Sequence, residues 1–180
     1  MARFRPSPPS RSGGEELNLD VGDVVVYGAH GAGSVVARET RSVEGEEETV
    51  IMIALAAGLS VQLPLALAQE QLRPIIDEAD IVNIQDVLRA TGAVSDDSWI
   101  KRRRDAEAKL RDAIGLAEVI RDGNAREAAP SRGSGSRLSP GERELVRRAR
   151  DLLTREIALA RDVGVADADA WLDGQLGVSR

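Results

Sequence analysis

The chain has no cysteine, a single histidine and very few aromatic residues, which make up 2% of its 180 residues. The missing cysteine excludes disulfide bonds and thiolate metal ligands, and it favours a cytoplasmic location. Because His30 is the single histidine, a multi-histidine metal site is excluded as well. No segment approaches the roughly 18 apolar residues of a membrane span, and the beginning of the chain lacks the apolar segment of a signal peptide. We therefore expect no metal, no cofactor and no membrane contact.

The chain is net acidic, with a formal charge of −6, and the charge is unevenly distributed. Residues 17–76 carry three basic and eight acidic side chains, whereas residues 77–180 carry eighteen basic and twenty acidic ones. This balance argues against a protein that coats DNA by itself, because such binding depends on neutralising many phosphates. Basic residues are concentrated locally, near Trp99 and between Arg143 and Arg155.

Residues 17–76 are predicted to form a small, strongly bent antiparallel β-sheet or barrel. Short β-prone runs, separated by glycine-rich or charged turns, are typical of such a sheet. These runs lie at residues 24–27, 33–37, 49–53 and 59–64. Residues 1–16 combine three prolines with few apolar side chains, which predicts a disordered tail.

From Asp77 onward the apolar period changes to about 3.6 residues, which predicts a compact all-α domain of four to five helices over residues 77–175. The first helix is expected to end at Thr91-Gly92, and the second to begin near Asp97 or Ser98 and continue past Leu110. The chain is thus predicted to be an α+β protein, with a β unit followed by a helical unit.

The second half of the helical unit has its own signals. A third helix is predicted from Leu116 to about Asp122 or a little further, followed by a flexible Gly/Ser loop at 130–137. Ser139, with proline next and a glutamate three residues on, forms a capping box that opens a long helix. A last short helix is expected around residues 170–172, before a tail at 176–180.

Two further segments are read as structural. The glycines on either side of His30, in residues 28–33, are a composition found in phosphate-binding loops. Because a β-prone run follows where such a loop requires a helix, a tight hairpin turn is favoured. The arginines between Arg143 and Arg155 alternate with acids at helical pair distances, which predicts a self-neutralised surface. No set of residues assembles a catalytic site, so the chain is predicted not to be an enzyme.

Trp99 stands just before four consecutive basic residues, Lys101 to Arg104. A large ring in this position can insert between DNA base steps while the neighbouring cations hold phosphates. Alternatively it can be a core residue, because helical phase places it in line with residues 106, 110, 113 and 117. Periodicity alone favours the core interpretation.

Several motifs, taken in order over residues 18–162, resemble the CarD/CdnL family of bacterial transcription regulators. Their N-terminal module is shared with transcription-repair coupling factors. Residues 21–27, followed by His30-Gly31 and Gly33, resemble the opening of that module, and Leu63-Pro64 and Leu72-Arg73 resemble its last strand and exit. In the helical part the resemblance rests on Trp99 ahead of Arg102 and Arg103, on residues 117–122, and on residues 138–143 with Ala149, Leu152, Leu153, Glu156 and Ala158.

The resemblance implies a Tudor-like β unit that docks on the RNA polymerase β subunit and a helical domain that touches promoter DNA. It further implies that Trp99 enters the minor groove at the upstream edge of the melted bubble, largely without reading sequence, and thereby stabilises the open promoter complex. The implied DNA-binding residues are Trp99, Lys101, Arg102, Arg103, Arg104 and Lys109, with Arg102 and Arg103 on phosphates and Lys101 and Arg104 assigned by proximity. The implied polymerase-binding residues are Arg41, Val43 and Gln62, where Gln62 replaces an arginine found in some members.

Two other functions stay open. In one, the β unit is a polymerase- or protein-binding adaptor, Trp99 is a core residue and the chain makes no direct DNA contact. In the other, the β unit is a standalone nucleic-acid-binding module, which the acidic charge of residues 17–76 disfavours. In each case we expect a cytoplasmic monomer without a cofactor.

Overall fold

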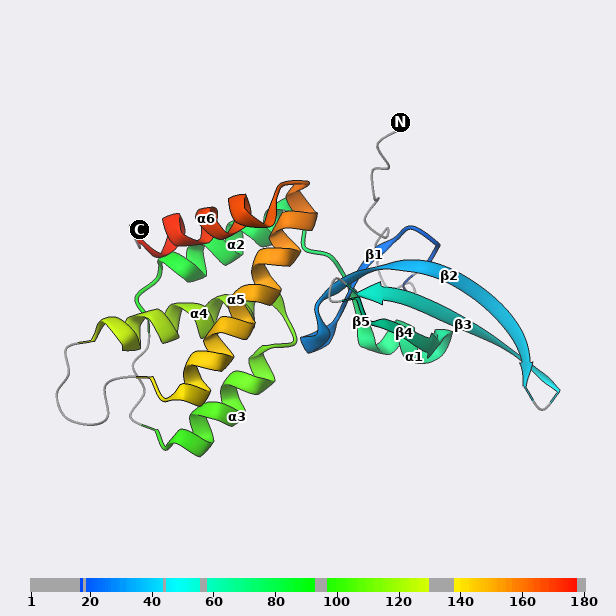
Figure 1. Cartoon of the computed structure of the whole chain (residues 1–180), viewed down its shortest axis with the longest axis horizontal. Helices are drawn as coiled ribbons and strands as arrows, with labels where there is room; N and C mark the ends of the chain where they lie inside the picture. The colour runs from blue at the N-terminus through cyan, green and yellow to red at the C-terminus, as the bar shows by residue number, and fades with distance from the viewer. Residues whose placement is uncertain are drawn as a thin grey trace. The chain divides into compact units, whose positions relative to one another are not determined.

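The computed structural model describes residues 17, 19–43, 45–55, 58–92, 97–129 and 138–177. The chain divides between Ile75 and Ile76 into two compact units, here named the β unit and the helical unit. The β unit is an antiparallel five-stranded sheet with one helix, and the helical unit contains the remaining α-helices of the described residues (Figure 1). The predicted α+β class is therefore confirmed. The tail predicted at 1–16 and the loop predicted at 130–137 lie outside the described residues.

The sheet of the β unit is open, with the strand order β4-β3-β2-β1-β5. Its strands are β1 (Val24–Tyr27), β2 (Ala32–Val43), β3 (Glu46–Leu55), β4 (Ser60–Pro64) and β5 (Leu72–Pro74). The pairing register between β2 and β3 shifts between Val35 and Ala37, so Val36 is an extra residue that bends β2. The two strands consequently form a long, curved hairpin (Figure 1).

The turn between β1 and β2 is the predicted tight hairpin, closed by the short 3-10 helix η1 (Gly28–His30). Gly28 and Gly31 have φ values of +44° and +91°, which L side chains rarely adopt. The rings of Tyr27 and His30 stack with their centroids 4.9 Å apart. The glycines of this segment thus serve the turn, and the strand that follows leaves no helix N-terminus to hold a phosphate.

One helix of the β unit, α1 (Leu65–Gln71), was not expected from the sequence. It follows β4 directly and contacts β3, β4 and β5, so that Ala68 is completely buried in the sheet's core. No side chain caps its first turn, and a proline precedes it, so the usual sequence signals of a helix start are missing. The other buried members of this core are Leu19, Val25, Val35, Ile51, Ile53, Leu55, Leu63 and Leu72.

The helical unit contains five helices in its described residues, within the predicted range. They are α2 (Glu78–Arg89), α3 (Trp99–Lys109), α4 (Ala113–Ala128), α5 (Pro140–Arg161) and α6 (Val165–Leu176). The predicted capping box is present at the start of α5, where Ser139 and Glu142 cap each other. Helix α6 extends one residue into the segment predicted as a tail. None of the helices within the described ranges is long and apolar enough to span a bilayer.

The expectation that the second helix continues past Leu110 is wrong. Helix α3 ends at Lys109, and a new helix, α4, begins at Ala113. The break occurs because Asp112 is an N-cap, whose carboxylate accepts a hydrogen bond of 2.7 Å from the backbone N–H of Gly115. The apolar residues at 113 and 117 therefore belong to α4, and the stripe in line with Trp99 does not lie on one helix.

A buried acid holds the beginning of the helical unit. Glu156 of α5 is 2% exposed, and its Oε1 accepts a hydrogen bond of 3.3 Å from the backbone N–H of Ile76. Ile76 directly precedes the N-cap of α2, Asp77, so a side chain near the end of α5 fixes where the chain enters α2. This contact gives Glu156, one of the residues of the family resemblance, a structural role.

Charged pairs also join α5 to its neighbours. Arg150 of α5 donates to Asp169 at 2.6 Å and to Asp173 at 2.5 Å, both on α6, and the side chain of Asp173 is 11% exposed. Arg161 of α5 pairs with Glu78 of α2 at 2.6 Å, and its guanidinium lies 5.0 Å from the ring centre of Trp171. Trp171 therefore belongs to the packing between α2, α5 and α6.

We expect Arg150→Ala to lower the free energy of unfolding of the helical unit by about 1–2 kcal/mol, because it leaves Asp173 largely buried without its cation. This value is below that of a fully buried pair, since the Arg150 side chain is 25% exposed. Urea titration followed by tryptophan fluorescence measures the change. In the triple variant that also carries Asp169→Asn and Asp173→Asn, part of the loss should be recovered. An equal or larger loss of unfolding free energy in the triple variant would contradict the role of Arg150 as the cation that Asp173 requires.

Candidate functional site

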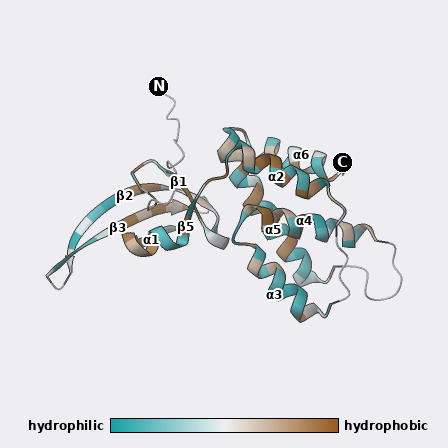
Figure 2. Ribbon diagram, turned by 180° about the vertical axis from the view of Figure 1, so that it is seen from behind, coloured by the Kyte–Doolittle hydropathy of each residue, from teal (hydrophilic) through white to brown (hydrophobic). Residues whose placement is uncertain are grey.

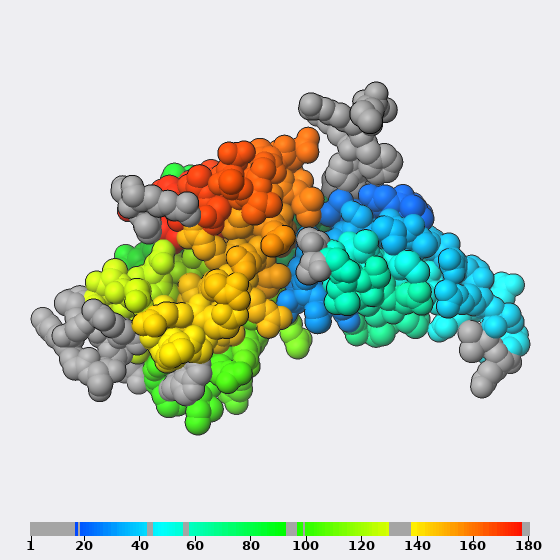
Figure 3. Space-filling model, in the orientation of Figure 1, coloured from blue at the N-terminus to red at the C-terminus, as the bar shows by residue number. Residues whose placement is uncertain are grey.

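Helix α3 begins at the residue that the sequence singles out. Ser98 is its N-cap, with a side-chain oxygen that accepts from the backbone N–H of Lys101, and Trp99 is its first residue. The side chain of Trp99 lies outside the described part of the chain, so both interpretations of its ring stay open. The helix itself is largely hydrophilic (Figure 2) and lies at the surface of the helical unit, where its atoms are green in Figure 3.

Most of the basic residues assigned to DNA have acidic partners. Lys101 pairs with Asp97 at 3.0 Å, Arg103 with Glu107 at 2.8 Å, and Lys109 with Glu118 of α4 at 2.7 Å. The hydrogen bond to Asp97 raises the pKa of Lys101, which therefore stays charged. Pairs that are this exposed are weak and exchange readily with water or with another anion. These three cations are thus accessible to phosphates, although the net positive charge around them is reduced.

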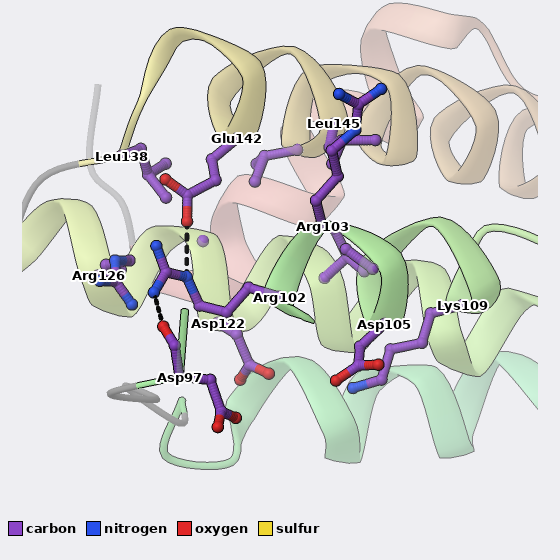
Figure 4. Close-up of a pocket in the computed structure, with 14 residues that line it drawn as sticks. Asp97, Arg102, Arg103, Asp105, Lys109, Asp122, Arg126, Leu138, Glu142 and Leu145 are labelled. Atoms are coloured by element: carbon purple, nitrogen blue, oxygen red, sulfur yellow. Dashed lines mark hydrogen bonds and ion pairs between the residues drawn. The ribbon is translucent and has the colours of Figure 1, made fainter. Parts of the chain in front are cut away.

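Arg102 differs from the other bases, because its partner is buried. Its Nε donates to Glu142 Oε1 of α5 at 2.8 Å, and its Nη1 donates to the backbone carbonyl of Asp97 (Figure 4). The two side chains of the ion pair are only 21% and 10% exposed. A cation held in this way is not presented to solvent as the other bases of α3 are.

Glu142 is the centre of this arrangement. One carboxylate oxygen accepts from Arg102, while the other accepts from the backbone N–H of Ser139 at 2.8 Å in the capping box of α5. Burial raises the pKa of Glu142, but hydrogen bonds from Ser139 and from Arg102 outweigh that effect, so the pKa is lowered overall. Glu142 is therefore ionised when it pairs with Arg102.

A pocket of about 270 Å³ lies between α3, α4 and α5, and Arg102 and Glu142 are in its wall (Figure 4). Its apolar lining residues include Val119, Val146 and Leu145. The charged lining residues cancel in number: Arg102, Arg103, Lys109 and Arg126 against Asp97, Asp105, Asp122 and Glu142. The pocket is therefore not a cradle for an anion.

The outward face of α3 carries Ile100 and Arg104, four residues apart. Ile100 is 78% exposed, and Arg104 is exposed as well. Within the described residues, Arg104 is the one base of the run without a hydrogen bond or ion pair. Arg104 was assigned to DNA by sequence proximity alone. In the structure, it is the residue between Lys101 and Arg104 whose positive charge is least compensated by an acid.

The expected polymerase contacts lie on the sheet. Arg41, on the distal part of β2, is opposite Glu48 of β3 and pairs with Glu39 at 3.0 Å. Gln62 of β4 is exposed and lies opposite Met52 of β3. Because paired residues share a face and alternate residues repeat it, the register places Arg41 and Gln62 on one face. The other face holds Ile51 and Ile53 in the core. Val43 ends β2, and its side chain lies outside the described residues.

The second basic cluster, between Arg143 and Arg155, is neutralised in part as predicted. Arg147 pairs with Glu144 at 2.5 Å and with Asp151 at 3.0 Å on the same helix. Arg143 lies 3.9 Å from Glu127 of α4, and Arg150 is bound to α6. This face of α5 therefore offers less free positive charge than its arginine content indicates.

Comparison with protein families gives two matches, one in each unit. Residues 19–76 match the CarD-like/TRCF RID domain, and residues 83–173 match the CarD C-terminal domain. The first match covers the sheet with Arg41 and Gln62, and the second covers all of α3, α4 and α5. The domains of this family are regulatory and not catalytic. With its two characteristic domains in order along the chain, the protein belongs to the CarD family.

Proposed function

We propose that the protein is a bacterial transcription regulator that docks on the RNA polymerase β subunit through its β unit and stabilises the open promoter complex through α3. The match of residues 19–76 to the domain shared with transcription-repair coupling factor carries this proposal. The docking face is the one that holds Arg41 and Gln62, both exposed. No sequence readout is required, because the contact is made to phosphates and to the minor groove.

The charges of α3 explain why such a protein needs polymerase. Acids paired with Lys101, Arg103 and Lys109 lower the local positive charge, so the affinity of the isolated protein for DNA is expected to be weak. Docking on polymerase raises the effective concentration of α3 near the promoter and replaces intrinsic affinity. Weak pairs at the surface exchange for phosphates once DNA is close.

We expect Arg41→Glu to lower the recovery of RNA polymerase by at least about tenfold, because it reverses a charge on the proposed docking face. The measurement is a pull-down of core polymerase with the tagged full-length chain. Arg155→Glu is the matched control, since it makes the same charge change at an exposed position on α5 and should leave recovery unchanged. Equal recovery with Arg41→Glu would exclude this docking residue. No recovery with the wild type would contradict the proposed function.

A second candidate function is an adaptor that binds polymerase and makes no DNA contact. It is favoured by the acidic partners of Lys101, Arg102 and Arg103 in α3. The two functions differ in one measurement, the lifetime of a heparin-challenged open complex. The adaptor predicts polymerase recovery with an unchanged lifetime, whereas direct stabilisation predicts a longer lifetime when the protein is present.

A further inference from the structure

The hydrogen bonds of Arg102 and Glu142 connect the start of α3 to the start of α5. Glu142 accepts from Ser139 with one oxygen and from Arg102 with the other. Arg102 in turn donates to the carbonyl of Asp97, directly before the N-cap Ser98. Figure 4 shows the two contacts of the Arg102 side chain, one to Glu142 and one to Asp97. The backbone that leads into Trp99 is thus attached to α5 through two side chains.

We infer that Arg102 is a positioning residue, which together with Glu142 fixes the Asp97–Ser98 segment and hence the direction in which α3 presents Trp99 and Arg104. This inference rests on the proposed function, because it concerns how α3 meets promoter DNA. It differs from the role that the family resemblance implies for Arg102, which is a phosphate contact. We name the contact the Arg102–Glu142 latch.

The burial of the pair separates the two roles. To reach a phosphate, Arg102 has to leave a carboxylate whose side chain is only 10% exposed, and that carboxylate then stays without its cation. A largely buried charge without its partner is strongly unfavourable. Lys101 and Arg103 face no such penalty, because their acids are 43% and 47% exposed and can be solvated by water. The latch therefore persists when DNA is bound, and the neighbouring bases contact the phosphates.

The variant Glu142→Gln distinguishes the roles, because they predict effects of opposite sign. If Arg102 contacts phosphate, removing the acid frees it, and the open complex lives longer or is unchanged. If Arg102 positions α3, the lifetime falls by about fivefold, the effect of weakening one charge-assisted hydrogen bond. Glutamine still accepts the backbone hydrogen bond of the capping box, so α5 should retain its start.

A second variant, Arg102→Lys, keeps the charge but loses the two-point contact of the guanidinium. Lysine binds phosphates as a point charge, so a phosphate contact would survive this change and a latch would not. The matched control is Arg155→Lys, which makes the same substitution at an exposed position of α5, outside the residues assigned to DNA, and should keep the wild-type lifetime. The Arg102→Lys variant also distinguishes the two roles of Arg102 if Glu142→Gln proves too unstable to measure.

Hydrogen exchange tests the latch without polymerase or DNA. The amides of Lys101 and Arg102, which bond to the Oγ and the carbonyl of Ser98, should exchange about tenfold faster in Glu142→Gln. Unchanged exchange, or a lifetime equal to or above that of the wild type in both latch variants, would overturn the inference. If faster exchange is found but the wild-type protein has no effect on lifetime, the latch exists and the proposed function is the part that fails.

Discussion

Replacing Gly115 by alanine is expected to lower the free energy of unfolding of the helical unit by about 3 kcal/mol. A Cβ at this position would lie 2.3 Å from the carbonyl oxygen of Lys109, the last residue of α3. The obstacle is backbone, so no rotamer change relieves the overlap and the two helices have to separate. This cost exceeds the gain of about 1 kcal/mol that alanine normally brings to a helix.

Gly174 is the matched control for this prediction. It lies in α6, and a Cβ added there meets nothing within 4 Å. Gly174→Ala should therefore raise the free energy of unfolding by about 0.5–1 kcal/mol through helix propensity alone. Urea titration with tryptophan fluorescence follows both variants, because Trp99 and Trp171 are both in the helical unit. Equal stability of Gly115→Ala and the wild type would show that α3 and α4 do not meet as closely as described.

The junction between α3 and α4 also shows what the sequence could and could not predict. Ser139, Pro140 and Glu142 predicted the start of α5 correctly, because a capping box is a local signal. The apolar phase predicted that the second helix continues past Leu110, whereas α3 ends at Lys109, because Asp112 begins α4 with a cap that competes with that phase. Periodicity reports which side chains are buried, and it does not report whether they belong to one helix.

The functional residues also divide into features that local sequence predicts and features that only tertiary structure shows. The family resemblance implied that Arg102 and Arg103 are both phosphate contacts, and only the packing of α5 against α3 separates them. The partner that holds Arg102 is 40 positions away, and its capping role was the one sign of it in the sequence. A glutamate at N3 has two oxygens and needs one for the cap, so the other is available to a distant cation. Which cation takes it depends on tertiary structure.

Helix α3 is consequently held at both of its ends. Its last residue approaches the first turn of α4 at Gly115, and its first turn is joined to α5 through Arg102 and Glu142. On the outward face of this helix, Ile100 and Arg104 are exposed. A ring carried on a helix supported at both ends loses little conformational freedom on insertion into DNA, which favours a stable complex.

Trp99→Ala is therefore expected to shorten the lifetime of the open promoter complex by about tenfold, since stacking of an aromatic ring on a base contributes about 1–3 kcal/mol. The measurement is the decay of heparin-resistant complexes with saturating protein. Trp99→Phe should retain part of the effect, because a smaller ring still covers part of the unstacked step. Polymerase recovery should not change, because Trp99 lies outside the β unit.

The control for Trp99→Ala is Trp171→Phe, which removes the other tryptophan, the one that lies under Arg161 in the helical unit. The lifetime of the open promoter complex with this variant should equal that with the wild type. The stability of Trp99→Ala without DNA separates the two interpretations of the ring. A minor-groove contact leaves the free energy of unfolding nearly unchanged, whereas a core tryptophan would lose about 3–5 kcal/mol. A large loss of stability would exclude insertion into DNA, and it would favour the adaptor that binds polymerase alone.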